Sequence, residues 1–260
     1  MSSDRMQFTR ALAAEAGARA LEHYDNLARL RVETKGVQDY VSEADRDVEA
    51  LIRARIEATF PGEGFIGEET GRTDGRGHWV VDPIDGTSNF LRGIPMFGVS
   101  IAYAEDGAVR CAAIRDVAQH RTYWAERGGG AFLDDAPIRV SSRDQVTEAA
   151  VCLGFWTKGE HAHFVEAMQR VVQTRCDFRR FGAATIALAL TAAGHMDGFW
   201  QARINSWDVA AGILLVEEAG GWVSPFIEDG GLDAPVPLLA CTPALRAPLS
   251  KILGFPGRNP

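Results

Sequence analysis

The chain has 260 residues, of which 46% are hydrophobic, and its formal net charge is −8. This acidic balance argues against a nucleic-acid backbone as the main partner, because such binding requires a basic surface. No basic stretch followed by an apolar core opens the chain, and no apolar run is long enough to span a bilayer. We therefore expect a cytoplasmic protein that does not bind membranes.

The length and the apolar content allow a substantial core, and no linker is visible. We expect a single domain over residues 1–260, with an α+β half at 1–145 and an α/β half at 146–260. The four cysteines show neither CxxC nor a metal-ligand spacing. This pattern favours free thiols in a reducing compartment over a disulfide framework.

Helical patterns come first in the chain and strand-like patterns follow. Apolar residues at helical spacing predict two helices, one over residues 8–30 and one from Ser42 or Asp45 to Ala58. Three apolar segments separated by Gly-containing turns predict an antiparallel meander with strands at 99–103, 109–115 and 122–125.

Strands and helices alternate in the second half. The predicted strands are 150–153, a segment near Phe178, 198–200, 222–224 and 237–240. The predicted helices are 161–172, 183–193, 209–219 and a last one with Thr242 at its N-cap and Pro243 at its first position. The two halves together predict a mixed α/β and α+β fold.

The segment WVVDPIDGTSNF, residues 79–90, carries the clearest chemical signal. Its first three residues predict a short buried strand that ends at Asp82, and the following proline prevents a helix from starting there. The turn after it can bring Asp82, Asp85 and the Ile84 carbonyl to one side. Such all-oxygen ligation suits magnesium or manganese rather than zinc.

The same segment also offers an anion site. If a short helix begins near Thr87, the backbone N–H groups of Gly86, Thr87 and Ser88 are left to bind a phosphate beside the metals. The plainer alternative is an Asp-Pro turn followed by an Asp-Gly turn, without any site.

Two further acidic segments lie elsewhere in the chain. Glu68 and Glu69 follow an apolar pair and a glycine, and Asp208 stands near the start of a predicted helix. Taken singly, the glutamates fit a solvated loop and Asp208 fits a helix cap favoured by the helix dipole.

Taken together, these segments resemble the inositol monophosphatase family over nearly the whole chain. The matching motifs, in order, are DYVSEAD at 39–45, GEE at 67–69, DPIDGTSNF at 82–90, R-x-x-G at 179–182, WDVAAG at 207–212 and EEAGG at 217–221. The resemblance implies a layered αβαβα sandwich of the inositol monophosphatase and fructose-1,6-bisphosphatase type. It also implies magnesium dependence, inhibition by lithium, a homodimer and hydrolysis of phosphate monoesters.

The expected mechanism uses positioned cations, because phosphoryl transfer spreads charge over the phosphoryl oxygens. One metal held by Glu68, Asp82 and the Ile84 carbonyl would activate a water. A second metal held by Asp82, Asp85 and Asp208 would stabilise the leaving oxygen. Glu68 and Thr87 would orient the water, with the threonine hydroxyl passing a proton towards a carboxylate.

Asp45 has two interpretations. It is a candidate supporting carboxylate for a third, weaker metal, and it equally fits an exposed residue in the first turn of a helix. The predicted substrate contacts are Asp85, Gly86, Thr87, Ser88, Arg179, Gln201 and Asp208.

The substrate is less well defined than the chemistry. Family members that act on inositol phosphate commonly carry a Glu seven residues before the WD aspartate, and this chain has Gln201 there. The amide lacks the charge-assisted acceptor that a carboxylate offers to a polyol. Arg179 would contact the substrate or a neighbouring subunit, or is simply a surface residue.

An inositol monophosphate is the leading substrate, since residues 88–99 look most like inositol phosphatases. Histidinol phosphate, fructose 1,6-bisphosphate and adenosine 3',5'-bisphosphate are the alternatives. A catalytically idle scaffold is a remote alternative, because it would have no use for a costly cluster of like charges.

Overall fold

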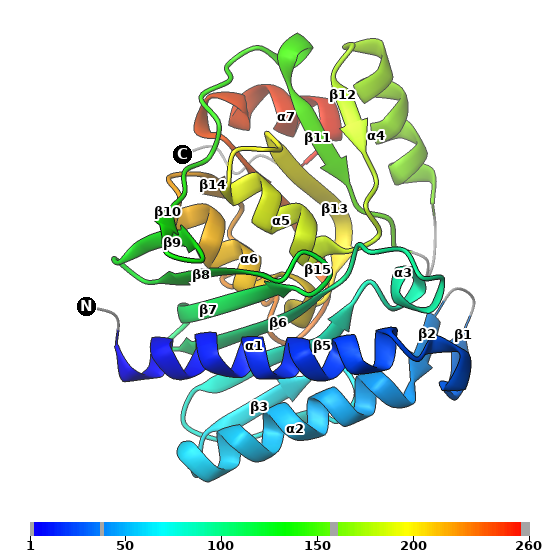
Figure 1. Ribbon diagram of the computed structural model, residues 1–260. Helices are drawn as coiled ribbons and strands as arrows, with labels where there is room; N and C mark the ends of the chain where they lie inside the picture. The colour runs from blue at the N-terminus through cyan, green and yellow to red at the C-terminus, as the bar shows by residue number, and fades with distance from the viewer. Residues whose placement is uncertain (1–2, 37–38, 157–160, 256–260) are drawn as a thin grey trace.

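Helices and sheets alternate in five layers (Figure 1) in the computed structural model, which describes residues 3–36, 39–156 and 161–255. The outer helices α1 (Asp4–Tyr24) and α2 (Glu43–Thr59) cover one face of the larger sheet. The inner helices α5 (Ala184–Ala192) and α6 (Ser206–Glu218) lie between the two sheets. The smaller sheet follows, and α4 (Ala162–Gln173) and α7 (Arg246–Leu253) cover its far face.

Eight strands form the larger sheet. They are β3 (Gly64–Gly67), β4 (Gly71–Thr73), β5 (His78–Asp85), β6 (Gly98–Glu105), β7 (Ala108–Asp116), β8 (Arg121–Glu126), β9 (Gly130–Leu133) and β10 (Ala136–Pro137). Their order across the sheet is β10-β9-β8-β7-β6-β5-β3-β4. Neighbours are antiparallel except β3 and β5, which run parallel.

Five strands form the smaller sheet, in the order β12-β11-β13-β15-β14. They are β11 (Ala150–Leu153), β12 (Asp177–Arg179), β13 (Gly198–Ile204), β14 (Trp222–Val223) and β15 (Val236–Cys241). A separate hairpin pairs β1 (Val32–Gly36) with β2 (Asp39–Ser42). The remaining short elements are α3 (Thr87–Leu91) and the 3-10 turns η1 (Leu27–Arg29), η2 (Val146–Glu148) and η3 (Pro243–Leu245).

The inner helices differ from the outer ones because both of their sides meet a sheet. Residues 209–216 of α6 are buried without a break, as expected for a helix that is apolar on every side. A Cβ atom on Gly212 would lie 2.5 Å from the Leu188 side chain of α5. A glycine is therefore needed there for the two inner helices to pack closely.

The layered αβαβα architecture confirms the fold expected from the resemblance. The meander and the alternating elements of the second half are confirmed, with bounds that differ by a few residues. The first helix starts earlier than predicted, because the Ser3 side chain accepts a hydrogen bond from Met6 N and caps it. The predicted helix after Thr242 is present, with Thr242 at its N-cap and Pro243 in its first turn; this turn is a 3-10 turn that leads directly into α7. The single-domain division stays a prediction.

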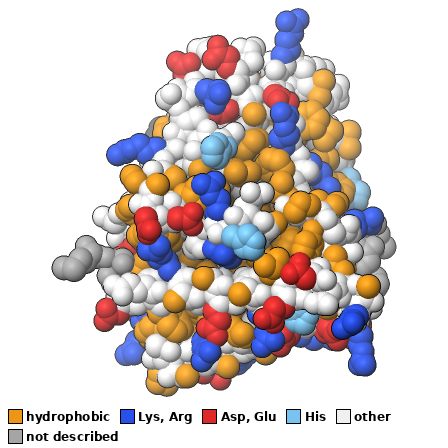
Figure 2. Space-filling model, viewed as in Figure 1, with side chains coloured by type: hydrophobic (Ala, Val, Ile, Leu, Met, Phe, Trp, Pro, Cys, Tyr) orange, Lys and Arg blue, Asp and Glu red, His pale blue; other side chains and the backbone are white. Residues whose placement is uncertain are grey.

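All four cysteines are buried and unpaired, which confirms the expected free thiols. On the face shown in Figure 2, basic and acidic side chains are interspersed over the surface. Within the described ranges, the helices are too short or too polar to cross a membrane. The expectation that nucleic acid is not a partner stays a prediction based on charge.

Candidate active site

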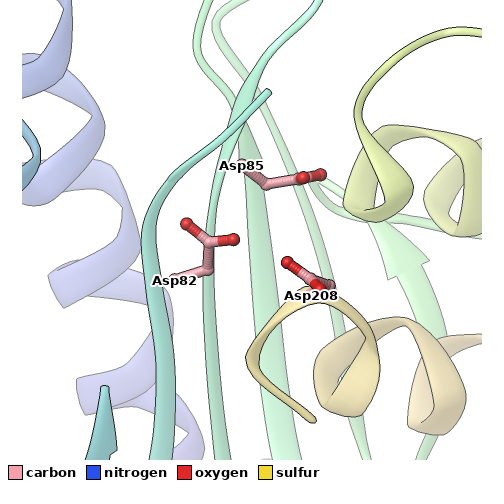
Figure 3. Close-up of side chains that lie close together, drawn as sticks. All are labelled: Asp82, Asp85 and Asp208. Atoms are coloured by element: carbon pink, nitrogen blue, oxygen red, sulfur yellow. The ribbon is translucent and has the colours of Figure 1, made fainter. Parts of the chain in front are cut away.

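A β-bulge on β5 brings two carboxylates to one side of the strand. β6 pairs Asp82 with Ser100 and Asp85 with Gly98, so that three steps along β5 match two along β6. In a regular strand, residues three apart point to opposite faces. The extra residue removes that difference, and Figure 3 shows both carboxylates directed towards the same space. Pro83 lies within the bulge, where a missing N–H is tolerated.

The third carboxylate comes from the first turn of α6. Asn205 N donates a hydrogen bond to Asp208 Oδ2 at 3.3 Å, which holds the side chain at the helix start. One oxygen each from Asp82, Asp85 and Asp208 lie within 4.8 Å of one another. The carboxylates of β5 and α6 therefore converge as predicted from sequence (Figure 3).

The first turn of α5 holds the Asp85 side chain in place by hydrogen bonds. Thr185 donates to Asp85 Oδ2 from its backbone N at 2.7 Å and from its Oγ1 at 2.6 Å. Sequence reasoning missed Thr185. The available signal was one of two threonines in a mostly apolar helix, at the position where an N-terminal turn offers unpaired N–H groups.

Burial and mutual repulsion make these carboxylates costly to ionise. Burial, followed by the nearby Glu68, Asp85 and Asp208 charges, raises the pKa of Asp82 well above its ordinary value. Burial, followed by the Asp208 charge, raises the pKa of Asp85 to about 7. A bound cation would remove this cost. Three converging carboxylates are hard oxygen donors and fit magnesium or manganese better than a sulfur- or nitrogen-seeking metal.

Thr87 links the backbone between Asp82 and Asp85 to Asp45. Its Oγ1 lies 3.2 Å from Asp45 Oδ1 and 3.1 Å from the Ile84 carbonyl oxygen. The other Asp45 oxygen accepts from Ser42 N at 2.8 Å and from Ser42 Oγ at 2.7 Å. Asp45 is 1% exposed, so the interpretation as an exposed helix residue is wrong. Burial raises its pKa, and the bonds from Ser42 oppose that rise.

The helix predicted near Thr87 is present as α3, and Gly86 precedes it with a φ of 90°. A Cβ atom on Gly86 would lie 3.0 Å from the Met96 carbonyl oxygen and 3.1 Å from Ala183 Cβ. The position therefore requires glycine for both conformation and space. The first internal bond of this turn is donated by Asn89 N to Gly86 O at 2.8 Å. The N–H groups of Thr87 and Ser88 precede it and have no partner within the turn.

A cleft of about 550 Å³ opens over these groups. Seven of the predicted site residues line it, namely Glu68, Asp85, Gly86, Thr87, Ser88, Gln201 and Asp208. Asp82 is 1% exposed and lies beneath the lining residues, where its carboxylate meets those of Asp85 and Asp208. Asp45 lies outside that group, and its role in a third metal site stays a prediction.

Arg179 does not line the cleft, whereas its neighbour Arg180 does. Arg179 shares a face of β12 with Asp177, to which its Nη1 donates at 2.6 Å. Arg180 is the first residue after β12. It stacks over the Phe155 ring, with its Cζ atom 5.7 Å from the ring centroid. A substrate contact from Arg179 within one chain is therefore not supported by this placement.

Gln201 lies where the resemblance placed it, at the cleft wall and 9% exposed. Its Nε2 donates to the Arg203 carbonyl oxygen at 2.8 Å. A Cβ atom on Gly154 would lie only 1.9 Å from Gln201 Oε1. The glycine leaves the space that the amide oxygen occupies.

Comparison with known proteins gives consistent matches. Residues 2–251 match the model of the inositol monophosphatase family. A protein of Mesorhizobium japonicum named inositol-1-monophosphatase is 42% identical over 226 residues, which are 85% of this chain and 84% of that protein. A Thermotoga maritima protein named fructose-1,6-bisphosphatase/inositol-1-monophosphatase is 36% identical over 86% of this chain and 85% of its own length.

Among solved structures, the extragenic suppressor protein suhB from Bartonella henselae superposes with a TM-score of 0.91. It is 34% identical and the match covers 98% of this chain and 100% of that one. The agreement extends over both sheets and all helix layers.

Proposed function

Because this chain belongs to the inositol monophosphatase family, we propose that it hydrolyses a small phosphate monoester, first of all an inositol monophosphate, with bound divalent cations. The observation that carries the proposal is the convergence of Asp82, Asp85 and Asp208 beneath the cleft, with ligand oxygens within 4.8 Å of one another. Like charges placed so closely serve a bound cation better than they serve the stability of the fold.

The metal-holding residues in this proposal are Glu68, Asp82, Asp85 and Asp208, together with the Ile84 carbonyl. We propose magnesium as the metal, with manganese as a substitute, because every donor is an oxygen. When bound, such ions neutralise the carboxylates and stabilise negative charge on the phosphoryl group and the leaving oxygen.

In our proposal Thr87 and Asp45 accept the proton that the attacking water loses. The Thr87 hydroxyl donates towards Asp45 Oδ1, 3.2 Å away, which leaves its lone pairs for a water held jointly with Glu68. As the water attacks, its proton passes to Thr87 Oγ1 and the threonine proton passes to Asp45. The raised pKa of Asp45 favours its role as the acceptor.

The phosphate itself is held by the turn that begins α3. Gly86, Thr87 and Ser88 line the cleft, and in our proposal their N–H groups donate to the phosphoryl oxygens. In our proposal Gln201 then contacts a substrate hydroxyl through its amide.

The position of Arg180 favours a second candidate substrate, a sugar bisphosphate such as fructose 1,6-bisphosphate. Its guanidinium lines the cleft, and among the described residues no carboxylate forms an ion pair with it. A second phosphate on the substrate would supply such a partner. The Thermotoga maritima relative is named for both activities, which is consistent with this candidate.

Other parts of the expected family behaviour belong to the same proposal. We propose that lithium inhibits the enzyme, that it works as a homodimer and that it works in the cytoplasm.

The test is phosphate release by the purified protein after metal removal with a chelator. Inositol 1-phosphate, fructose 1,6-bisphosphate, histidinol phosphate, adenosine 3',5'-bisphosphate and glycerol 2-phosphate are compared with and without added magnesium. We expect magnesium-dependent release, fastest with inositol 1-phosphate. If no phosphate is released from any substrate with either magnesium or manganese, the interpretation as a catalytically idle scaffold would be favoured. Faster release from fructose 1,6-bisphosphate would establish the second candidate.

A further inference from the structure

Helix α2 carries a second buried carboxylate, Glu49, to which the chemistry above assigns no role. Its side chain is completely buried. Both of its oxygens accept backbone hydrogen bonds, Oε2 from Glu69 N at 2.9 Å and Oε1 from Thr70 N at 2.7 Å. A buried carboxylate loses its hydration, and two charge-assisted bonds of this kind compensate that loss. Glu49 is therefore bound to the turn that follows β3.

The sequence around this turn is adapted to the carboxylate. A Cβ atom on Gly67 would lie 2.7 Å from Glu49 Oε2 and 2.5 Å from the Phe65 ring. Any side chain at position 67 would displace the carboxylate from the N–H groups that it accepts. The glycine of the Gly-Glu-Glu motif thus makes room for Glu49, and the next residue in the chain is Glu68.

Glu49 stands one helical turn after Asp45 on the same face of α2. Asp45 contacts Thr87 in the turn after β5, and Glu49 contacts the turn after β3. Helix α2 packs against β5, and β5 runs parallel to its neighbour β3 (Figure 1). One face of one helix therefore holds two segments of the site that are separate in sequence.

We propose that Glu49 is a positioning residue that fixes the turn after β3 so that the Glu68 carboxylate faces the metal group. This inference rests on the proposed function, because Glu68 is a metal ligand only within it. Glu49 itself is fully buried and does not line the cleft, so it acts through the turn and not on substrate.

The test compares Glu49→Gln with Glu63→Gln, a matched buried glutamate. Glu63 precedes β3 whereas Glu68 follows it, and it accepts from Trp79 Nε1 at 2.7 Å and from Arg5 Nη1 at 2.7 Å. Its side chain is 5% exposed, so both substitutions remove one buried charge from the same part of the fold. Glu63 does not line the cleft.

In Glu49→Gln the amide group opposes one of the two N–H donors, so one bond is lost. We expect manganese binding, measured by calorimetry, and the magnesium concentration for half-maximal rate to weaken roughly 10- to 100-fold. The rate at saturating magnesium should fall much less. Hydrogen exchange of the amides of residues 68–70 should accelerate. Glu63→Gln should lower the melting temperature while leaving metal affinity and these amides unchanged.

Gly67→Ala provides a second variant if Glu49→Gln does not fold, since it displaces the same carboxylate without removing its charge. It should weaken manganese binding in the same direction. If both variants bind manganese as tightly as the natural sequence does, the inference about Glu49 would be overturned and the proposed function would stand. Absence of manganese binding by the natural sequence would overturn the proposed function and the inference with it.

Discussion

Two parts of the cleft differ in how firmly the protein holds them. In the buried part, Asp82 and Asp85 are at most 8% exposed, and Asp85 accepts two hydrogen bonds from Thr185. In the exposed part, Arg180 rests on the Phe155 ring at 5.7 Å, with no further side-chain partner among the described residues. In our proposal the buried part carries out the chemistry and the exposed part affects substrate choice.

The largest effect is expected from Asp82→Asn in the buried part. Losing the central carboxylate should lower metal-dependent phosphate release about a thousandfold or more. The melting temperature of the metal-free protein should rise, because burial and repulsion already penalise this charge, as its raised pKa indicates. Phosphate release and thermal unfolding measured on the same sample check both results. Retained activity would remove Asp82 from the metal site.

Thr87→Ala tests the proton path next to the carboxylates. Removing the hydroxyl that lies 3.2 Å from Asp45 Oδ1 should lower kcat about a hundredfold at saturating magnesium. Thr87→Ser keeps the hydroxyl and should retain most of the rate. If Thr87→Ala kept the rate of the natural sequence, the hydroxyl would have no part in the reaction.

Gly86→Ala tests whether the backbone of the buried part is as constrained as its side chains. The φ of 90° costs an alanine about 1–2 kcal/mol, and the new Cβ would meet the Met96 carbonyl oxygen at 3.0 Å. We expect the melting temperature to fall by roughly 2–8 °C. Gly107→Ala is the control, since Gly107 has a φ of 72° with nothing within 4 Å of the added carbon. Equal losses in both variants would show that the close contact is unimportant.

The smallest effect is expected in the exposed part. Arg180→Ala should raise KM for fructose 1,6-bisphosphate roughly two- to fivefold, as an exposed ion pair would, and leave KM for inositol 1-phosphate unchanged. Arg179→Ala is the matched control, because Arg179 pairs with Asp177 and does not line the cleft. Equal effects on both substrates would mean that Arg180 does not recognise a second phosphate.

The sequence was informative where a site residue lies inside a short motif. Asp82, Asp85 and Thr87 fall within six residues, and the helix start that carries Asp208 has its own motif. The resemblance to the family implied that Asp208 joins Asp82 and Asp85, and the structure brings these three together. The sequence did not show why the Asp82 and Asp85 side chains point to the same side of the strand. The motif suggested a strand that ends at Asp82, whereas β5 continues to Asp85 through a bulge set by its pairing with β6.

The residues that hold the site were missed because they lie far away in the sequence. Thr185 is 100 residues from Asp85, and Glu49 is 20 residues from Glu69. A threonine or a glutamate on a helix carries no local sign of such a partner. Arg180 was missed for another reason. The R-x-x-G pattern begins at Arg179, and it does not indicate which of two adjacent arginines lines the cleft.

The central claim is that the carboxylates of β5 and α6 bind divalent cations. The most direct measurement is the anomalous scattering of crystals grown with manganese, for the natural sequence and for Asp208→Asn. We predict manganese between Asp82, Asp85 and Asp208, with occupancy reduced in the variant. Crystals without manganese at these carboxylates, at a concentration that supports phosphate release, would contradict the account.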